Sequence, residues 1–250
     1  VVDYILTLEE ATKLRLVAPF KIKIVELELD TINKNIKSGS LTNVFYQTEA
    51  AKYAYLDTIA KRDISNKFAV LARMKFIYSC PSKTEAAKFI ISQIPKDERS
   101  ILFCGGIEQT IELCPYRFFS KPICKKTDPL DKQERVNRIL KEYKGDIDLK
   151  KFIRGTIPQI ACVNSLDEGH NLPKLDIAIV VQGTNSDRKM IQRIGRFLRN
   201  RLGHEALIVI LCVKSTVDEK WINNALQEVD KDKIERIKFK DLKNGIVKIW

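Results

Sequence analysis

Three arginines in the C-terminal half of the chain have a spacing suited to phosphate binding. In the run Gln192-Arg193-Ile194-Gly195-Arg196-Phe197-Leu198-Arg199 they recur at every third position, so that on a helix they lie along one side. Each guanidinium group stays charged and grips phosphate oxygens with a rigid fork of donors. The row suits a polyphosphate that gains charge during phosphoryl transfer. The alternative is a solvated basic face of a helix, and the spacing alone does not separate the two.

The elements that must position this row alternate between strand and helix. Short apolar runs predict strands that are buried on both faces, as in a parallel sheet, over residues 100–104, 159–163, 177–181 and 206–213. The segments between and around them are expected to be helical, over residues 82–94, 108–114, 128–143, 188–198 and 217–229. This alternation predicts βαβ crossovers and a doubly wound α/β sheet. In such a sheet, function gathers in the loops beyond the carboxyl ends of the strands.

The N-terminal part has a different pattern of residue types and is rich in lysine. We expect helices over residues 7–16 and 42–62. The alternating run Lys21–Leu29 predicts a strand with one solvated face, on a sheet edge or in a small appended element. Ser82-Lys83-Thr84-Glu85 has the pattern of a capping box that opens the next helix.

The arginine run resembles motif VI of superfamily 2 helicases, Q/H-R-x-G-R-x-x-R, and fills every fixed position of it. Upstream, Val163–Pro173 resembles motif V, and Ile101–Gly106 resembles motif IV, a buried strand that ends in a loop. The three occur in the order and at the separation found in the family. The chain thus resembles the second RecA-like domain of such a helicase. The resemblance implies a doubly wound, mainly parallel RecA-like sheet with flanking helices, plus a smaller N-terminal extension.

The resemblance also implies how the chain is divided and to which branch it belongs. Residues 1–80 are expected to form a linker or accessory segment leading out of a first motor domain, residues 81–230 the second RecA-like domain, and residues 231–250 a C-terminal extension. Gln192 stands where DEAD-box proteins usually have His, and motif V has Glu-Gly-x-Asn instead of Arg-Gly-x-Asp. These residues favour the phage-type and recombination-type branch, related to the DEAD/DEAH proteins, which remodels DNA.

The resemblance implies a role for each matching position. Arg196 and Arg199 match the arginines that reach the γ-phosphate, and Arg193 matches the arginine that pairs with the opposite domain. The further positions expected to line the nucleotide are Glu168, Gly169, Asn171 and Gln192. The positions expected to touch the nucleic-acid backbone are Gly105, Gly106, Asn164 and Ser165. For this last group the alternative is that the residues merely turn the chain.

The chain has no G-x-x-x-x-G-K-S/T sequence, the loop that cradles nucleotide phosphates. We therefore expect ATP and Mg²⁺ to bind only together with a first motor domain that carries this loop, in the same or another chain. Alone, the chain is not expected to hydrolyse ATP. The leading hypothesis is the C-terminal motor domain of an ATP-dependent helicase or translocase. The alternative is a non-catalytic module with a motor-like fold that binds nucleic acid or another ATPase.

The charge of the chain favours a polyanionic partner. The 44 Lys and Arg outnumber the 32 Asp and Glu, which gives a net charge of +12 and a pI near 9.4. Nucleic acid is the expected partner, with DNA favoured over RNA by the resemblance. Residues 119–154 are especially basic, with 11 Lys and Arg against 6 Asp and Glu. They form either an insertion that contacts nucleic acid or, as we favour, a solvated helical hairpin.

Two further features concern the compartment. No apolar run reaches the roughly 18 residues of a membrane span, so we expect no membrane association. The six cysteines lack the paired spacing of a zinc site and are expected to be free thiols, with no metal bound. We therefore expect an intracellular protein, in the cytoplasm, the nucleoid or the nucleus.

Overall fold

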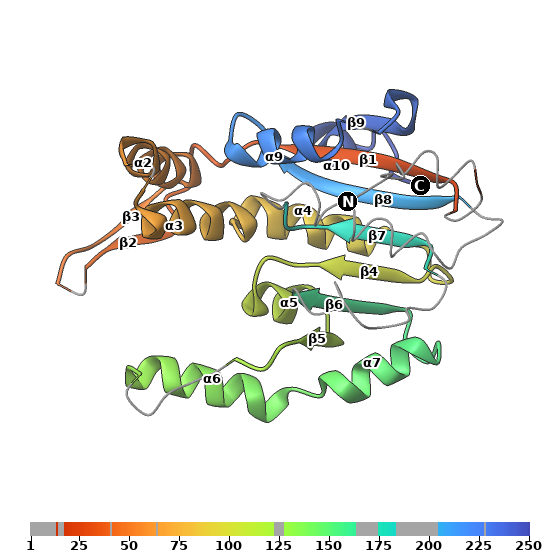
Figure 1. Cartoon of the computed structure of the whole chain (residues 1–250), viewed down its shortest axis with the longest axis horizontal. Coiled ribbons are helices and arrows are strands. Elements are labelled where there is room, and N and C mark those ends of the chain that lie inside the picture. Colours follow the sequence, from red (N-terminus) through yellow and green to blue (C-terminus); the bar gives the residue numbers. More distant parts are fainter. Residues whose placement is uncertain are drawn as a thin grey trace, which may run out of the picture.

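A seven-stranded, fully parallel sheet forms the centre of the molecule (Figure 1). The computed structural model describes residues 14, 18–40, 42–63, 65–122, 128–163, 175–183, 205–227 and 229–250. The strand order is β5-β6-β4-β7-β8-β1-β9. The strands are β1 (Phe20–Leu27), β4 (Ser100–Phe103), β5 (Arg117–Phe119), β6 (Gln159–Val163), β7 (Ile177–Val180), β8 (Ala206–Val213) and β9 (Ile234–Lys238). Strands β4, β6, β7 and β8 confirm the four that the apolar runs predict.

Helices cover both faces of this sheet and enclose two hydrophobic clusters. On one face, α4 (Pro81–Ser92), α5 (Ile107–Leu113) and α10 (Phe239–Lys243) contribute buried side chains. On the other face, α7 (Gly145–Ile153) and α9 (Val217–Ala225) do the same. The central strands β4, β6, β7 and β8 therefore send alternate side chains into two different cores, which is why their sequences are apolar almost throughout. The expected doubly wound RecA-like architecture is confirmed.

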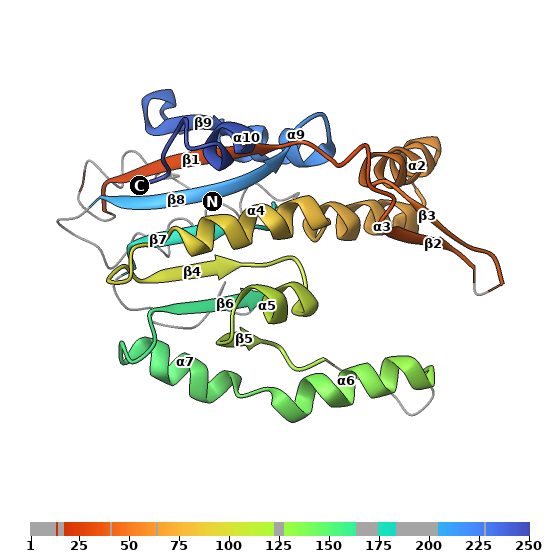
Figure 2. The same cartoon turned by 180° about the vertical axis from the view of Figure 1, so that it is seen from behind.

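A smaller unit projects beyond the carboxyl ends of the strands (Figures 1 and 2). It consists of the antiparallel hairpin β2 (Ile36–Gly39) and β3 (Val44–Gln47), followed by α2 (Glu49–Arg62) and α3 (Lys67–Tyr78). This unit is the N-terminal extension that was expected. The predicted helix over residues 42–62 is wrong in its first part, because Val44, Phe45 and Tyr46 favour a strand and pair with β2. The helix begins after Thr48, whose hydroxyl accepts the Ala51 N–H at 3.2 Å.

Strand β1 lies inside the sheet, between β8 and β9, so its expected place on an edge or in an appended element is wrong. Of the polar positions that suggest a solvated face, Lys21 and Glu28 are exposed, whereas Lys23 and Glu26 are largely covered and paired. Glu26, for example, is 10% exposed and lies 3.0 Å from Arg236 and 3.2 Å from Lys214. The sheet therefore contains a strand from each of the two segments that are expected to flank it, β1 from residues 1–80 and β9 from residues 231–250.

The start of α4 and the basic stretch also differ from expectation. Helix α4 begins with Pro81 and has no side-chain cap, because Ser82 is bonded to Glu49 instead of closing a capping box. The basic stretch contains the helices α6 (Leu130–Glu142) and α7. In both views they follow one another along the β5 side of the sheet and do not fold into a hairpin (Figures 1 and 2). Helix α6 is largely solvated, whereas α7 buries Leu149 and Phe152 in the core.

Several expectations lie outside the described residues, among them the helices over residues 7–16 and 188–198 and the state of Cys124. The free thiols expected of the remaining cysteines are confirmed for Cys80, Cys104, Cys114, Cys162 and Cys212, all of which are buried. Burial raises the pKa of Cys80 and Cys212 to about 12, because a thiolate there loses its hydration. These thiols act as core side chains.

A buried ion pair ties the two helical layers together at the carboxyl end of the sheet. Lys83 on α4 and Asp218 at the start of α9 are both 0% exposed, and their Nζ and Oδ2 atoms lie 2.8 Å apart. Asp218 Oδ2 also accepts the Val213 N–H at the end of β8, at 2.9 Å. Burial raises the pKa of Asp218, while Lys83 and the Val213 N–H act in the opposite direction. A helix from each face is thus joined through two charges that have no access to water.

The substitution Asp218→Asn tests how much the domain depends on this pair. It keeps an acceptor for Val213 but leaves the Lys83 ammonium buried without a counter-charge, which costs about 3–5 kcal/mol. We expect this loss in the free energy of unfolding measured with urea. The control is Glu112→Gln in the exposed Lys88–Glu112 pair, whose loss is expected to stay below about 1 kcal/mol.

Combining Lys83→Met with Asp218→Asn removes the orphaned charge, so the combined variant is expected to be more stable than Asp218→Asn alone. A combined variant that is less stable than the single one would contradict the assignment of the cost to the unpaired lysine.

Candidate functional site

The three segments that carry the sequence motifs leave the sheet at the same edge. They follow β4, β6 and β7, which are adjacent and parallel, so that Phe103 lies opposite Cys162 on one side and opposite Val180 on the other. The carboxyl ends of these three strands therefore lie next to one another. Loops at this edge of a doubly wound sheet are where ligands usually bind.

The described residues include only a part of the predicted site. Gly105 and Gly106 follow β4 and are described. The remaining predicted residues lie outside the described part of the chain: Asn164, Ser165, Glu168, Gly169 and Asn171 after β6, and Gln192, Arg193, Arg196 and Arg199 after β7. The structure thus brings the starting points of the three segments together, and the roles of individual side chains stay predictions.

The two glycines after β4 differ in their surroundings. A Cβ atom on Gly105 would lie 2.6 Å from the Tyr78 Cβ and 2.8 Å from the Tyr78 carbonyl oxygen, so the close approach of α3 requires glycine here. The Gly105 N–H donates to Gln109 Oε1 at 2.8 Å. Gly106 precedes α5 and has open space around it, with the nearest atom, Glu108 Oε2, at 3.9 Å. Gly105 therefore has a packing role, whereas Gly106 has no such constraint.

The start of the arginine segment is held against the buried ion pair. A Cβ atom on Gly183, three residues after the end of β7, would lie 2.4 Å from Asp218 Oδ1. The preceding residue, Gln182, is buried, and its N–H donates to the Phe103 carbonyl oxygen at 3.0 Å. The backbone that leads toward Arg193 therefore passes so close to Asp218 at Gly183 that no side chain fits there. The sequence does not predict the roles of Lys83, Gly183 and Asp218. They are far apart in the chain, and their roles depend on contacts that exist only in the folded domain.

The same edge also carries the contacts that hold the projecting unit. The Glu49 carboxylate is fully buried and accepts the N–H groups of Asp30 at 3.0 Å and Ser82 at 2.7 Å, together with the Ser82 hydroxyl. The Tyr53 hydroxyl accepts the Val217 N–H at 2.8 Å. Helix α2 is thus bonded to the starts of both α4 and α9.

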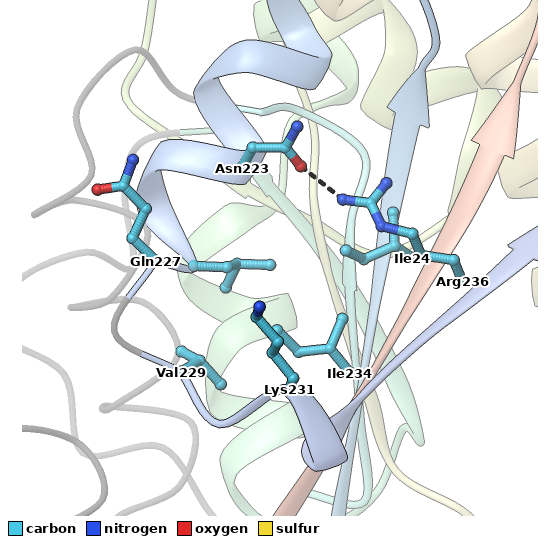
Figure 3. Close-up of a pocket in the computed structure, with 8 residues that line it drawn as sticks. Ile24, Asn223, Gln227, Val229, Lys231, Ile234 and Arg236 are labelled. Atoms are coloured by element: carbon cyan, nitrogen blue, oxygen red, sulfur yellow. Dashed lines mark hydrogen bonds between the residues drawn. The ribbon is translucent and has the colours of Figure 1, made fainter.

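A hollow lies away from these loops (Figure 3). It has a volume of about 440 Å³ and is bounded by the C-terminal end of α9 and by β1 and β9. Apolar side chains line most of it, and Arg236 crosses one side to donate to Asn223. Since α9 begins at the carboxyl edge and runs back along the sheet, this hollow is not part of the site that the three segments form.

None of the helices in the described part of the chain has the length and hydrophobicity needed to span a bilayer.

Comparison with known proteins gives a family match over the region of the three motifs. Residues 82–201 match the helicase conserved C-terminal domain. A curated relative, the DNA 3'-5' translocase XPB2 of Sulfurisphaera tokodaii, is 26% identical over 213 residues, which are 81% of this chain and 45% of XPB2. The chain therefore spans less than half the length of this relative.

Solved structures give weaker similarities. The S. cerevisiae protein Dbp5 bound to RNA and ADP BeF3 has a TM-score of 0.44 at 14% identity, over 66% of this chain and 40% of that chain. The E. coli DEAD-box protein SrmB bound to regulator of ribonuclease activity A has a TM-score of 0.41 at 16% identity, over 62% of this chain and 83% of that chain. The matched region 82–201 contains α4, β4 to β7 and all three motif segments. Over residues 82–201, just under half of its length, the chain therefore carries a helicase conserved C-terminal domain.

Proposed function

We propose that this chain is the second motor domain of an ATP-dependent helicase or translocase that acts on nucleic acid, with DNA as the favoured substrate. The observation that carries the proposal is the departure of three motif segments from adjacent parallel strands at one edge of the sheet. A ligand at this edge contacts several segments at once. The name of the relative XPB2, a DNA 3'-5' translocase, supports the choice of DNA.

In this proposal the chain supplies positive charge to a nucleotide that a first motor domain holds. ATP contributes the phosphoryl group that is transferred, and Mg²⁺ neutralises part of its charge. Arg196 and Arg199 stabilise the charge that develops on the γ-phosphate, and Arg193 couples closure of the two domains to catalysis. Glu168, Gly169, Asn171 and Gln192 line the nucleotide from this side. The described residues support such a site in one respect: Gly183, from which the arginine segment departs, packs closely against the buried Asp218.

The first motor domain is part of the proposal because the chain lacks a phosphate loop. No G-x-x-x-x-G-K-S/T sequence occurs in it. The only run with the letters D-E-x-H, Asp167–His170, lies in the motif V segment after β6 and inside the family match. We therefore assign it to motif V and not to the Mg²⁺-binding tetrad of a first domain.

The proposed contacts to nucleic acid involve Gly105, Gly106, Asn164 and Ser165. Among the two described glycines, Gly106 is the better candidate, because its surroundings are open whereas Gly105 is packed against Tyr78. Alternating contacts of this kind with the phosphate backbone, released and reformed as ATP is hydrolysed, move the motor along its substrate.

The alternative function is a module that binds nucleic acid or another ATPase without catalysis. The absence of a phosphate loop from the chain favours it, and the complete arginine row favours the motor. The motor and the non-catalytic module are distinguished by adding the first motor domain and measuring ATP turnover, which only the motor would show.

Substituting Arg196→Ala in the protein that includes the first motor domain is expected to reduce ATP turnover by about 10³- to 10⁵-fold, the range found for arginine fingers. The affinity for nucleic acid is expected to change only a few-fold. The measurements are steady-state phosphate release and fluorescence anisotropy with a labelled oligonucleotide. Arg201→Ala, a nearby arginine outside the motif VI pattern, serves as the control. Unimpaired turnover in Arg196→Ala would remove this residue from the proposed role.

Binding of a single-stranded oligonucleotide by the 250-residue chain is expected to weaken steeply with salt. The logarithm of the association constant should fall with the logarithm of the salt concentration by about 0.7 for each phosphate contacted. An oligomer of the same base sequence with an uncharged peptide backbone controls for contacts that do not involve phosphate. A flat salt dependence with the charged strand would contradict the basic surface as the contact.

A further inference from the structure

The projecting unit is anchored to the domain beside the candidate site. Its base is held by the buried Glu49 and by the bond from Val217 to Tyr53. Asp57 on α2 lies 2.7 Å from Arg73 on α3, and both side chains are less than one-fifth exposed. The hairpin β2–β3 is therefore carried at a fixed place beyond the carboxyl ends of the strands (Figures 1 and 2).

The hairpin exposes an unusual set of side chains. Val44, Phe45 and Tyr46 are consecutive residues of β3 and are 45%, 50% and 57% exposed. Successive residues of a strand point to opposite faces, so both faces of the hairpin present an apolar side chain to solvent. A two-stranded hairpin is seldom stable without a packing partner, and contiguous exposed apolar surface marks an interaction site.

Each face of the hairpin combines an aromatic ring with a lysine. On one face Tyr46 lies directly opposite Lys37, so their side chains are neighbours. On the other face Phe45 lies opposite Ser38, whose hydroxyl accepts a hydrogen bond from Lys52 Nζ of α2 at 3.2 Å. The same ammonium lies 6.0 Å from the ring centroid of Tyr55, which is 59% exposed. Both faces therefore offer a ring for stacking and a positive charge beside it.

The charge of the unit determines which partner fits. Residues 31–79 contain eight Lys and Arg, at positions 34, 37, 52, 61, 62, 67, 73 and 75, against three acids at positions 49, 57 and 63. Of the three acids, Glu49 is buried and Asp57 is paired with Lys61 and Arg73. The outer surface is therefore cationic. A polyanion that also carries exposed aromatic rings is a single strand of nucleic acid, and such strands bind to proteins by stacking on aromatic side chains along a basic surface.

We propose that the hairpin and the adjoining side of α2 form a stacking platform for single-stranded nucleic acid. Tyr46, Phe45 and Tyr55 supply the rings, and Lys37 and Lys52 contact the phosphates. This inference rests on the proposed function and adds a contact surface outside the three motif segments. It places part of the single strand against the projecting unit, on the side of the sheet edge where those segments begin.

The experiment measures binding of a fluorescein-labelled single-stranded DNA of mixed sequence to the 250-residue chain by anisotropy. Tyr46→Ala is expected to weaken binding by about 5- to 150-fold, the loss of one stacked base. Tyr46→Phe keeps the ring and is expected to bind like the parent chain. Lys37→Gln is expected to lower the slope of the salt dependence by about 0.7, the value for one phosphate on a single strand. The controls are Ile246→Ala and Lys240→Gln, exposed residues distant from the hairpin.

A second measurement separates stacking from general apolar contact. A strand that contains 2-aminopurine loses fluorescence when that base stacks on a ring, and Tyr46→Leu is expected to abolish this quenching while thermal unfolding stays unchanged.

If the parent chain binds no nucleic acid at low salt, the proposed function itself is contradicted. If the parent chain binds but all platform variants bind equally well, only the platform is wrong. Loss of self-association in the variants, with unchanged DNA binding, would instead identify the hairpin as an interface between copies of the chain.

Discussion

The pairing of Lys83 with Asp218 sets the geometry of the functional edge. Two charges without access to water must stay together, since separating them leaves each one in a medium that cannot solvate it. One partner belongs to the helical layer on one face of the sheet and the other to the layer on the opposite face. The pair therefore joins the two layers across the ends of the strands. Gly183 lies against the carboxylate, so the segment with the arginine row begins at a point that this pair defines.

Much of the central sheet could be predicted from the sequence, and the reason is physical. Strands buried on both faces must be apolar throughout, so residues 159–163 and 206–213 are recognisable without knowledge of their neighbours. Strand β1 shows the limit of this reasoning. Its alternation of polar and apolar residues indicated a solvated face, but Glu26 is covered because Arg236 and Lys214 neutralise it. Those partners are about 200 positions away in the chain, and no local pattern reveals such pairing.

The candidate site was predictable where its residues form short runs and not where it depends on single contacts. The order of the three motif segments along the chain follows from the sequence alone. The parallel topology then places the strands that precede them side by side. The supporting residues are different: Glu49, Tyr53 and Gly183 have ordinary sequence surroundings, and their importance comes from partners on other elements. The hairpin was missed for a similar reason, because a short strand beside a long helix was absorbed into the helical pattern of residues 42–62.

The position of β1 has a consequence for how the chain becomes folded. Strand β1 precedes every other described strand of the sheet, yet both of its neighbours, β8 and β9, come from the last fifth of the sequence. A ribosome must therefore synthesise nearly the whole chain before β1 finds its place, and contacts this distant in sequence form slowly. Until then an apolar strand with free hydrogen-bonding groups is open to mispairing. During synthesis of this domain, β1 therefore stays exposed until it pairs with β8 and β9.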